Sequence, residues 1–248
     1  MLPVFLPDEL ITEVLSLLPF HCGFGYDNST GTYKIVSLCQ MRKEVRVLRI
    51  GDNVWRSILC FPDAQVSISL TGVYVNGSLN WLTIPKQSDY GYSAKTLTIN
   101  QFGIISLDLS KETYLQLLPP RGFDKVPVVR PNLFVLMDSL CFSHDFNETD
   151  LIIWQMKQFG VQESWIQLLK ISYHTLRIVY NVRLQSILFP LYLSENGDTL
   201  ILMSNEGDHQ AILYNLRDNT VEKTRITNKV TLFLSKDYVE SLVSTCLK

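Results

Sequence analysis

The feature that most constrains this sequence is a succession of short apolar–polar alternations separated by turn residues, which runs from Gly23 to Thr231. In Ile105–Leu109 the apolar residues recur at every second position, as expected for a strand with one buried face. Val73–Val75 and Leu79–Trp81 flank Asn76-Gly77, and both residues of that pair tolerate the positive φ of a tight hairpin turn. Many short strands at such spacing predict an all-β, antiparallel domain, either a sandwich, a barrel or a propeller.

Weak internal repeats favour the propeller among these architectures, because each blade repeats a unit of a few antiparallel strands. Three sets of segments resemble one another: Asn76–Trp81 with Met137–Phe142 and Asn196–Leu200; Leu107–Thr113 with Tyr214–Thr220; and Val54–Ile58 with Ser164–Leu168. Their uneven spacing leaves the number of blades open. The prediction is therefore a propeller-like (kelch-like) domain of undetermined blade count.

The N-terminal segment predicts one short helix over residues 7–18. Pro7 suits a first helical position, Asp8 and Glu9 suit the positive end of the helix dipole, and Pro19 ends the helix. One face is apolar: Leu10, Ile11, Val14, Leu15 and Leu18. A helix this short is marginal alone, so its face is expected to pack on something. A further turn of helix is expected near residues 236–242.

Composition excludes several classes of function. The net charge is −2, which gives no reason to expect a nucleic acid or an anionic membrane as the main partner. The five cysteines are scattered without a CxxC pair, so they predict buried thiols in a reducing compartment rather than a zinc or redox site. Acidic residues interrupt the leucine-rich start, which argues against a signal peptide. We expect a soluble protein of the cytoplasm, the nucleus or both.

Several segments, taken in order, resemble plant F-box proteins with an F-box-associated domain, often called the F-box/kelch-repeat type. Residues 6–19 are similar to the opening helix of an F-box. The remaining matching segments, in chain order, are Gly23–Asp27, Tyr33–Val36, Gly72–Leu82, Ile105–Leu109, Leu117–Pro119, Ile153–Lys157, Gly160–Trp165 and Tyr238–Ser244. The resemblance divides the chain into residues 1–22, a truncated F-box, and residues 23–248, an F-box-associated β domain.

The resemblance implies a substrate-recognition subunit of an SCF-type E3 ubiquitin ligase that has no catalysis, metal or cofactor of its own. The F-box would bind a Skp-type adaptor, and the β domain would bind an unknown protein substrate through residues that the sequence does not identify. The implied adaptor-binding residues are Leu6, Pro7, Leu10, Ile11, Val14, Leu15, Leu18 and Pro19. The same apolar face would equally suit packing on the β domain.

One departure from the family pattern bears on adaptor binding. An F-box normally continues into two further helices, but here Pro19 is followed only by Phe20, His21 and Cys22 before the β domain. We therefore expect adaptor binding to be weak or lost. An alternative function is an orphan β-propeller interaction module without a ligase connection.

Other polar and aromatic residues favour structural roles. Trp55, Trp81, Trp154 and Trp165 are expected in the core rather than at a binding surface. A basic cluster, Arg42, Lys43, Arg46 and Arg49, predicts a solvated strand face. The histidines, His21, His144, His174 and His209, lack metal-ligand spacing. The carboxylates of Asp108, Asp138, Asp145 and Asp198 predict Asx-turns. A sugar-acting propeller enzyme or lectin would require two of them to face each other, and it remains a third hypothesis.

Overall fold

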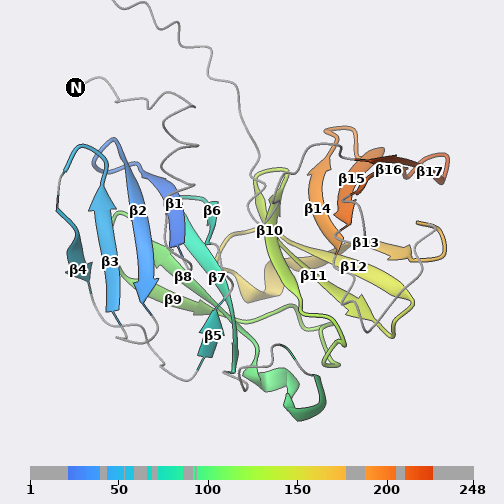
Figure 1. Ribbon diagram of the computed structural model, residues 1–248, viewed down its shortest axis with the longest axis horizontal. Helices are drawn as coiled ribbons and strands as arrows, with labels where there is room; N and C mark the ends of the chain where they lie inside the picture. The colour runs from blue at the N-terminus through green and yellow to red at the C-terminus, as the bar shows by residue number, and fades with distance from the viewer. Residues whose placement is uncertain are drawn as a thin grey trace, which may run out of the picture.

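The structure is a computed structural model that describes residues 22–39, 44–52, 54–58, 66–68, 72–85, 92, 94–176, 188–204 and 210–225. These residues form four antiparallel sheets that follow one another in chain order (Figure 1). The all-β, antiparallel, propeller-like prediction is confirmed. The helix predicted over residues 7–18 and the turn predicted near residues 236–242 lie outside the described residues.

We call the sheets blades 1 to 4. Blade 1 consists of β1 (Cys22–Asp27), β2 (Thr32–Cys39), β3 (Glu44–Arg49) and β4 (Arg56–Ile58). In blade 2, β5 (Val66–Ile68) and β6 (Val73–Val75) pair along one edge of β7 (Ser78–Pro85), followed by β8 (Gly103–Asp108) and β9 (Tyr114–Leu117). If β5 and β6 are counted together as one interrupted first strand of blade 2, the strands of each blade are joined in simple succession, and each blade is a meander.

The second half of the chain repeats this arrangement. Blade 3 consists of β10 (Asn132–Leu136), β11 (Ser139–Phe146), β12 (Asp150–Met156) and β13 (Trp165–Ser172). Blade 4 consists of β14 (Leu188–Leu193), β15 (Thr199–Ser204), β16 (Gln210–Asn215) and β17 (Thr220–Arg225). The described helical turns are three 3₁₀ segments, Ala94–Thr96, Ile99–Gln101 and Gln162–Ser164. None of the described helices has the length and apolar character to cross a bilayer.

The first strands of the blades lie innermost and contact one another in the order β1, β6, β10, β14. This is the arrangement of a β-propeller, in which blades radiate from a central axis. Among the described strands, the substantial contacts between blades join blade 1 to 2, 2 to 3 and 3 to 4. The described blades therefore form an arc, with blade 1 and blade 4 at its two ends (Figure 1).

The repeats seen in the sequence occupy equivalent positions in different blades. The Asn76-Gly77 turn joins the first two strands of the meander at β6 and β7, with φ of 52° and 76°. Met137 and Asp138 make the equivalent turn of blade 3, with φ of 49° and 53°, and Gly197 lies in that of blade 4. Positive φ at both central residues matches the twist of a two-residue hairpin turn. The sequence similarity therefore reflects a shared backbone requirement.

The hydrophobic core lies between successive blades, as alternation along β7 shows. Leu79 and Trp81 point toward blade 1 and pack with Val36 and Val47, whereas Leu82 and Ile84 belong to the cluster shared with blade 3. Because successive side chains of a strand point to opposite faces, one strand contributes to two cores. Trp81 is fully buried, and a Cβ at Gly72 would lie 2.6 Å from its ring.

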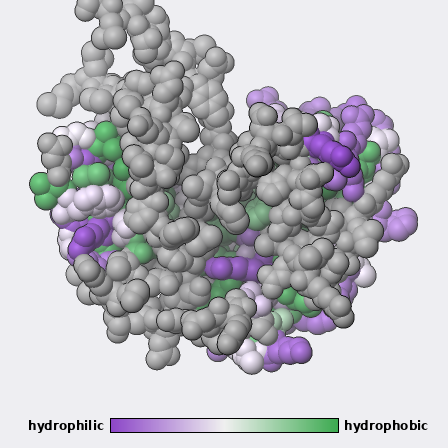
Figure 2. Space-filling model, viewed as in Figure 1, coloured by the Kyte–Doolittle hydropathy of each residue, from purple (hydrophilic) through white to green (hydrophobic). Residues whose placement is uncertain are grey.

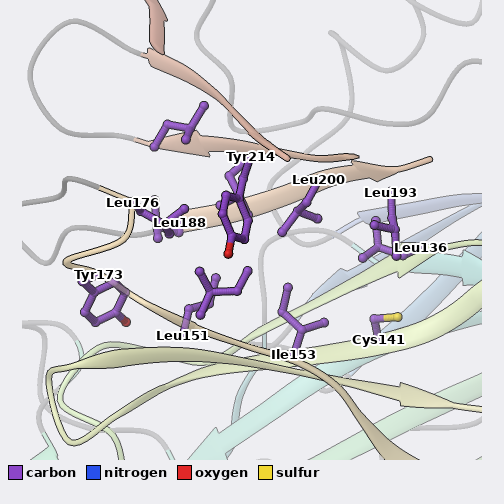
Figure 3. Close-up of a cluster of buried hydrophobic side chains, with 13 residues drawn as sticks. Leu136, Cys141, Leu151, Ile153, Tyr173, Leu176, Leu188, Leu193, Leu200 and Tyr214 are labelled. Carbon is purple, nitrogen blue, oxygen red and sulfur yellow. The ribbon is translucent and has the colours of Figure 1, made fainter. Parts of the chain in front are cut away.

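Figure 3 shows the third core, between blades 3 and 4. Leu151, Ile153 and Cys141 from blade 3 face Leu200 and Tyr214 from blade 4. Burial raises the pKa of the Cys141 thiol to about 12, so Cys141 serves as a small apolar side chain. Cys22 is also buried.

The core prediction is confirmed for Trp81 and Trp165, which are buried, and Trp154 is half-buried against the core. It is wrong for Trp55, which is 37% exposed. Trp165 packs in the cluster between its own blade and the preceding one. Trp55 holds the equivalent position in blade 1, the first blade of the described arc. No described blade precedes it, so this tryptophan lacks the sheet that covers Trp165.

Candidate functional site

The topology gives the arc two unlike faces. Because neighbouring strands are antiparallel, the turns that follow the first and third strands of every blade lie on one face, which we call the tight-turn face. The other connections lie on the opposite face, which we call the long-loop face. There the described chain includes residues 94–102 before β8 and residues 118–131 before β10, of which residues 118–121 extend along the outer edge to the β12–β13 connection. Long loops on a rigid scaffold are the usual carriers of binding function.

The two long loops meet over the junction of blades 2 and 3. The hydroxyl of Tyr92, in the first loop, donates a hydrogen bond to the Pro127 carbonyl of the second at 2.7 Å. Phe123 packs edge-on against Phe102 and Phe142, with ring centroids 5.2 and 5.0 Å apart. These contacts fix the base of the long-loop face on the core below it. Burial raises the pKa of Tyr92, so its hydroxyl stays neutral.

His144 lies beneath the same loops and is fully hydrogen-bonded. Its Nδ1 lies 2.9 Å from the Asp145 carbonyl, and its Nε2 accepts a hydrogen bond from Trp154 Nε1 at 3.2 Å. This pairing makes Nδ1 the donor and keeps the imidazole neutral, and burial lowers its pKa in the same sense. Both nitrogens are occupied, so His144 is a structural residue. Among the described residues there is no cluster of three or more metal-ligating side chains.

Arg130 stands at the point where the second long loop enters β10, the innermost strand of blade 3. Its side chain is half-buried, and one terminal guanidinium nitrogen is completely buried without a hydrogen-bond acceptor. Desolvation lowers the pKa of Arg130, with only Tyr92 opposing the shift. Within the described part of the chain, no carboxylate forms an ion pair with this arginine. It is thus a desolvated cation on the long-loop face.

The tight-turn face instead holds a fully paired charge network at the junction of blades 1 and 2. We call Asp27, Lys34, Arg56 and Glu112 the interblade charge network. The ammonium of Lys34 lies 2.8 Å from Asp27 and 2.9 Å from Glu112 and also donates to the Leu109 carbonyl. Arg56 pairs with both oxygens of Glu112. The network joins two blades and leaves no charge available to a ligand.

The two carboxylates of this network remain ionised in the fold. Burial alone would raise the pKa of Asp27, but hydrogen bonds from Lys34, Ser110, Ser29 and Thr30 outweigh it, and the pKa falls far below its usual value. The guanidinium of Arg56 is the main cause of the lowered pKa of Glu112. The function of this network is therefore to hold blade 1 on blade 2.

An exposed apolar patch lies on the outer edge, where blades 2 and 3 meet. It consists of Leu115, Leu118 and Val161; Ile166 is exposed as well, but it follows Trp165 in β13 and so points to the opposite face of that strand. The segments that hold these residues are joined: Trp165 Nε1 donates to the Leu118 carbonyl at 3.1 Å, and Gln162 Nε2 donates to the Pro119 carbonyl at 2.8 Å. Figure 2, which views the molecule as Figure 1 does, shows hydrophilic side chains gathered over the outer strands of blade 4.

The residues singled out from sequence fall in separate places. The implied adaptor-binding set, Leu6, Pro7, Leu10, Ile11, Val14, Leu15, Leu18 and Pro19, lies outside the described residues, as do Arg42, Lys43, His21 and His209. The four aspartates occupy different turns or strand ends. Asp108 accepts hydrogen bonds from the backbone of Ser110 and Lys111, which confirms its Asx-turn. Asp145 accepts from Tyr173 and from the backbone of Glu148.

Sequence reasoning missed Arg130, Tyr92 and the interblade charge network. A partial signal for the long-loop face was present, because residues 118–131 have no strand alternation yet lie between two predicted strands. Nothing in the sequence indicated that Arg130 would lack an acceptor. That property depends on which segments fold next to it.

Comparison with known proteins decides the family. Residues 19–245 match the model of the F-box associated beta propeller domain. This chain belongs to that family. The F-box-associated propeller is 32% identical over 157 residues to an F-box/kelch-repeat protein of Arabidopsis thaliana, a match that covers 60% of this chain and 39% of that protein. It is 23% identical over 250 residues to the F-box protein CPR1 of the same plant, covering 90% of this chain and 56% of the relative.

The F-box-associated propeller thus spans about half, or less, of the curated relatives that it matches. Among solved structures it resembles TolB of Acinetobacter baumannii, at 12% identity and a TM-score of 0.44 over 83% of this chain and 44% of TolB. It also resembles an exo-β-1,3-galactanase of Phanerochaete chrysosporium, at 10% identity and a TM-score of 0.47 over 85% of this chain and 50% of the enzyme. Likenesses this distant carry no argument about activity.

Proposed function

We propose that this chain is a non-catalytic substrate-recognition subunit of an SCF-type E3 ubiquitin ligase, acting in the cytoplasm or the nucleus. Its long-loop face would bind the target protein, and residues 6–19 would bind a Skp-type adaptor. The single observation that carries the proposal is the match to the F-box-associated propeller over residues 19–245, on a scaffold whose long loops gather on one face. Function in such folds resides in the loops rather than in the scaffold.

The strength of adaptor binding is the sharpest part of this proposal. β1 already begins at Cys22, so the two residues between Pro19 and that strand leave no room for two further F-box helices. Burying one Leu-sized side chain stabilises a complex by about 1.5–3 kcal/mol, whereas association costs about 4–15 kcal/mol in lost freedom. One short helix must also fold as it binds. We therefore expect weak adaptor binding or none.

The test is a calorimetric titration of the chain with a purified Skp-type adaptor. Three proteins are compared: the chain itself, its Leu10→Asp variant, and a form with two F-box helices from an Arabidopsis relative inserted between Pro19 and Cys22. We expect binding only after the insertion. Tight stoichiometric binding by the unmodified chain, abolished by Leu10→Asp, would show that the first helix suffices. No binding by the inserted form would contradict the ligase role.

The alternative role is an interaction module without a ligase connection, and the short interval between Pro19 and β1 favours it. The two roles differ in a reconstituted ubiquitination assay that contains the adaptor, cullin and RING subunits. Ubiquitin transfer to a bound target, dependent on Leu10, supports the ligase role. Target binding without transfer supports the alternative.

A further inference from the structure

Arg130 is the charged group of the long-loop face that the fold does not explain. Its half-buried side chain follows Pro127 and Val129, which are both buried, so the backbone on this side is anchored. Yet no described residue accepts a hydrogen bond from its guanidinium, and one terminal nitrogen has lost its water as well. Leaving a buried charged donor unsatisfied is costly, and buried arginines are normally paired.

Polar side chains that contact this loop or the neighbouring strand β11 already have other partners. The Tyr92 hydroxyl donates a hydrogen bond to the Pro127 carbonyl, and Asp145 accepts hydrogen bonds from the Tyr173 hydroxyl and the Glu148 backbone. Lys125, on the same loop, donates to Asn147. Since Arg121 also pairs with Glu163, Arg130 is the one cation on residues 118–131 whose guanidinium or ammonium donates to no group of the described structure.

We propose that Arg130 is an anion-recognition residue of the long-loop face, which binds the side-chain carboxylate of an aspartate or glutamate in the partner protein. This inference rests on the proposed function and adds the chemistry of the target segment. A guanidinium presents parallel N–H donors that match a carboxylate, and desolvation strengthens such a pair. The anchored loop holds the donor in place before the partner arrives, which reduces the ordering cost of binding.

The test uses a phage-displayed library of random dodecapeptides selected on the immobilised whole chain. We expect the peptides recovered with the wild-type chain to be enriched in Asp or Glu at one position. The enrichment should disappear with Arg130→Met and persist with Lys125→Met, a control on the same loop. A peptide pool without acidic enrichment, including failure to recover any binding peptide, would overturn the proposal, as would the same enrichment with Arg130→Met.

A double-mutant cycle then tests the contact directly. Replacing the acidic residue of the best peptide by its amide should weaken binding to the wild-type chain by about tenfold or more, and leave binding to Arg130→Met unchanged. Arg130→Lys, which keeps the charge but not the paired donors, should bind with intermediate affinity. Equal losses on both proteins would show that the carboxylate contacts another residue.

The melting temperature of Arg130→Met distinguishes a recognition role from a structural role, because the two roles predict opposite changes. Because Arg130 lacks an acceptor, Arg130→Met should melt at the same temperature as the wild-type chain or higher. A clearly lower melting temperature would mean that the guanidinium stabilises the fold and would overturn the proposal. Failure of the adaptor titration leaves these results unaffected, so the two proposals can fail separately.

Discussion

Replacing Lys34 by methionine tests how strongly the interblade charge network stabilises the propeller. Lys34 is buried, and its ammonium contacts two carboxylates and the Leu109 carbonyl. Lys34→Met fills a similar volume but leaves Asp27 fully buried without its cation. Removing one partner of a buried ion pair costs about 3–5 kcal/mol. We expect a loss near the lower end, because the hydroxyls of Ser29, Thr30 and Ser110 still bind Asp27.

Asp27→Asn should cost less, about 1–3 kcal/mol, because Lys34 keeps Glu112 and the Leu109 carbonyl as acceptors. The double variant should be no less stable than Lys34→Met alone, since no unpaired charge then remains at position 27. The assay is urea unfolding at pH 7, followed by tryptophan fluorescence. Lys111→Met, which removes an exposed ammonium 3.6 Å from Asp108, is the matched control and should change stability by less than about 0.5 kcal/mol.

Two results would refute this reasoning. One is a Lys34→Met variant within about 1 kcal/mol of the wild-type chain. The other is strict additivity of the two substitutions, which would mean that Asp27 and Lys34 do not interact across the first two strands of blade 1.

The remaining predictions concern acid, packing and reactivity. The pKa values of Asp27 and Glu112 are lowered in the fold, so the unfolded chain takes up protons first; urea stability should fall as pH drops below about 5, and less steeply in Asp27→Asn. Gly72→Ala places a methyl group 2.6 Å from the Trp81 ring and should cost about 1–3 kcal/mol, partly restored by adding Trp81→Phe. At pH 8, iodoacetamide should alkylate Cys141 only after denaturation, as measured by peptide mass spectrometry, because burial raises the thiol pKa to about 12.

The sequence predicted the local backbone of this propeller well, because turn chemistry and strand alternation are local properties. Asn76-Gly77 and Met137-Asp138 were matched by similarity alone, and both adopt the positive φ that such turns require. The repeats also align Trp55 with Trp165, and the structure places both at, or immediately before, the start of the fourth strand of their blades. Whether a neighbouring blade covers that position is not local, and this is why the burial of Trp55 was mispredicted.

The candidate site could not be predicted from the sequence, because it too depends on contacts between segments that are far apart in the chain. The Ser110 hydroxyl donates a hydrogen bond to Asp27, although most of blades 1 and 2 separates the two residues along the chain. The contact forms only when the β8–β9 turn packs beside β1. Arg130 is one of 22 lysines and arginines in the chain, and its sequence neighbours do not distinguish it. Its guanidinium lacks an acceptor because the described segments that fold next to it place no free carboxylate or carbonyl within hydrogen-bonding distance.

Lys34 and Arg130 give opposite predictions for the same chemical change, and the contrast tests the division between the two faces. Each is a buried or half-buried cation at a blade junction, but three acceptors surround Lys34, whereas Arg130 has none among the described residues. Lys34→Met should therefore lower the urea midpoint at pH 7, and Arg130→Met should leave it unchanged or raise it. A loss of stability in both variants would mean that Arg130 has a structural acceptor. A loss in neither would mean that water already screens the Lys34 network, and that the fold does not depend on buried charge at the tight-turn face.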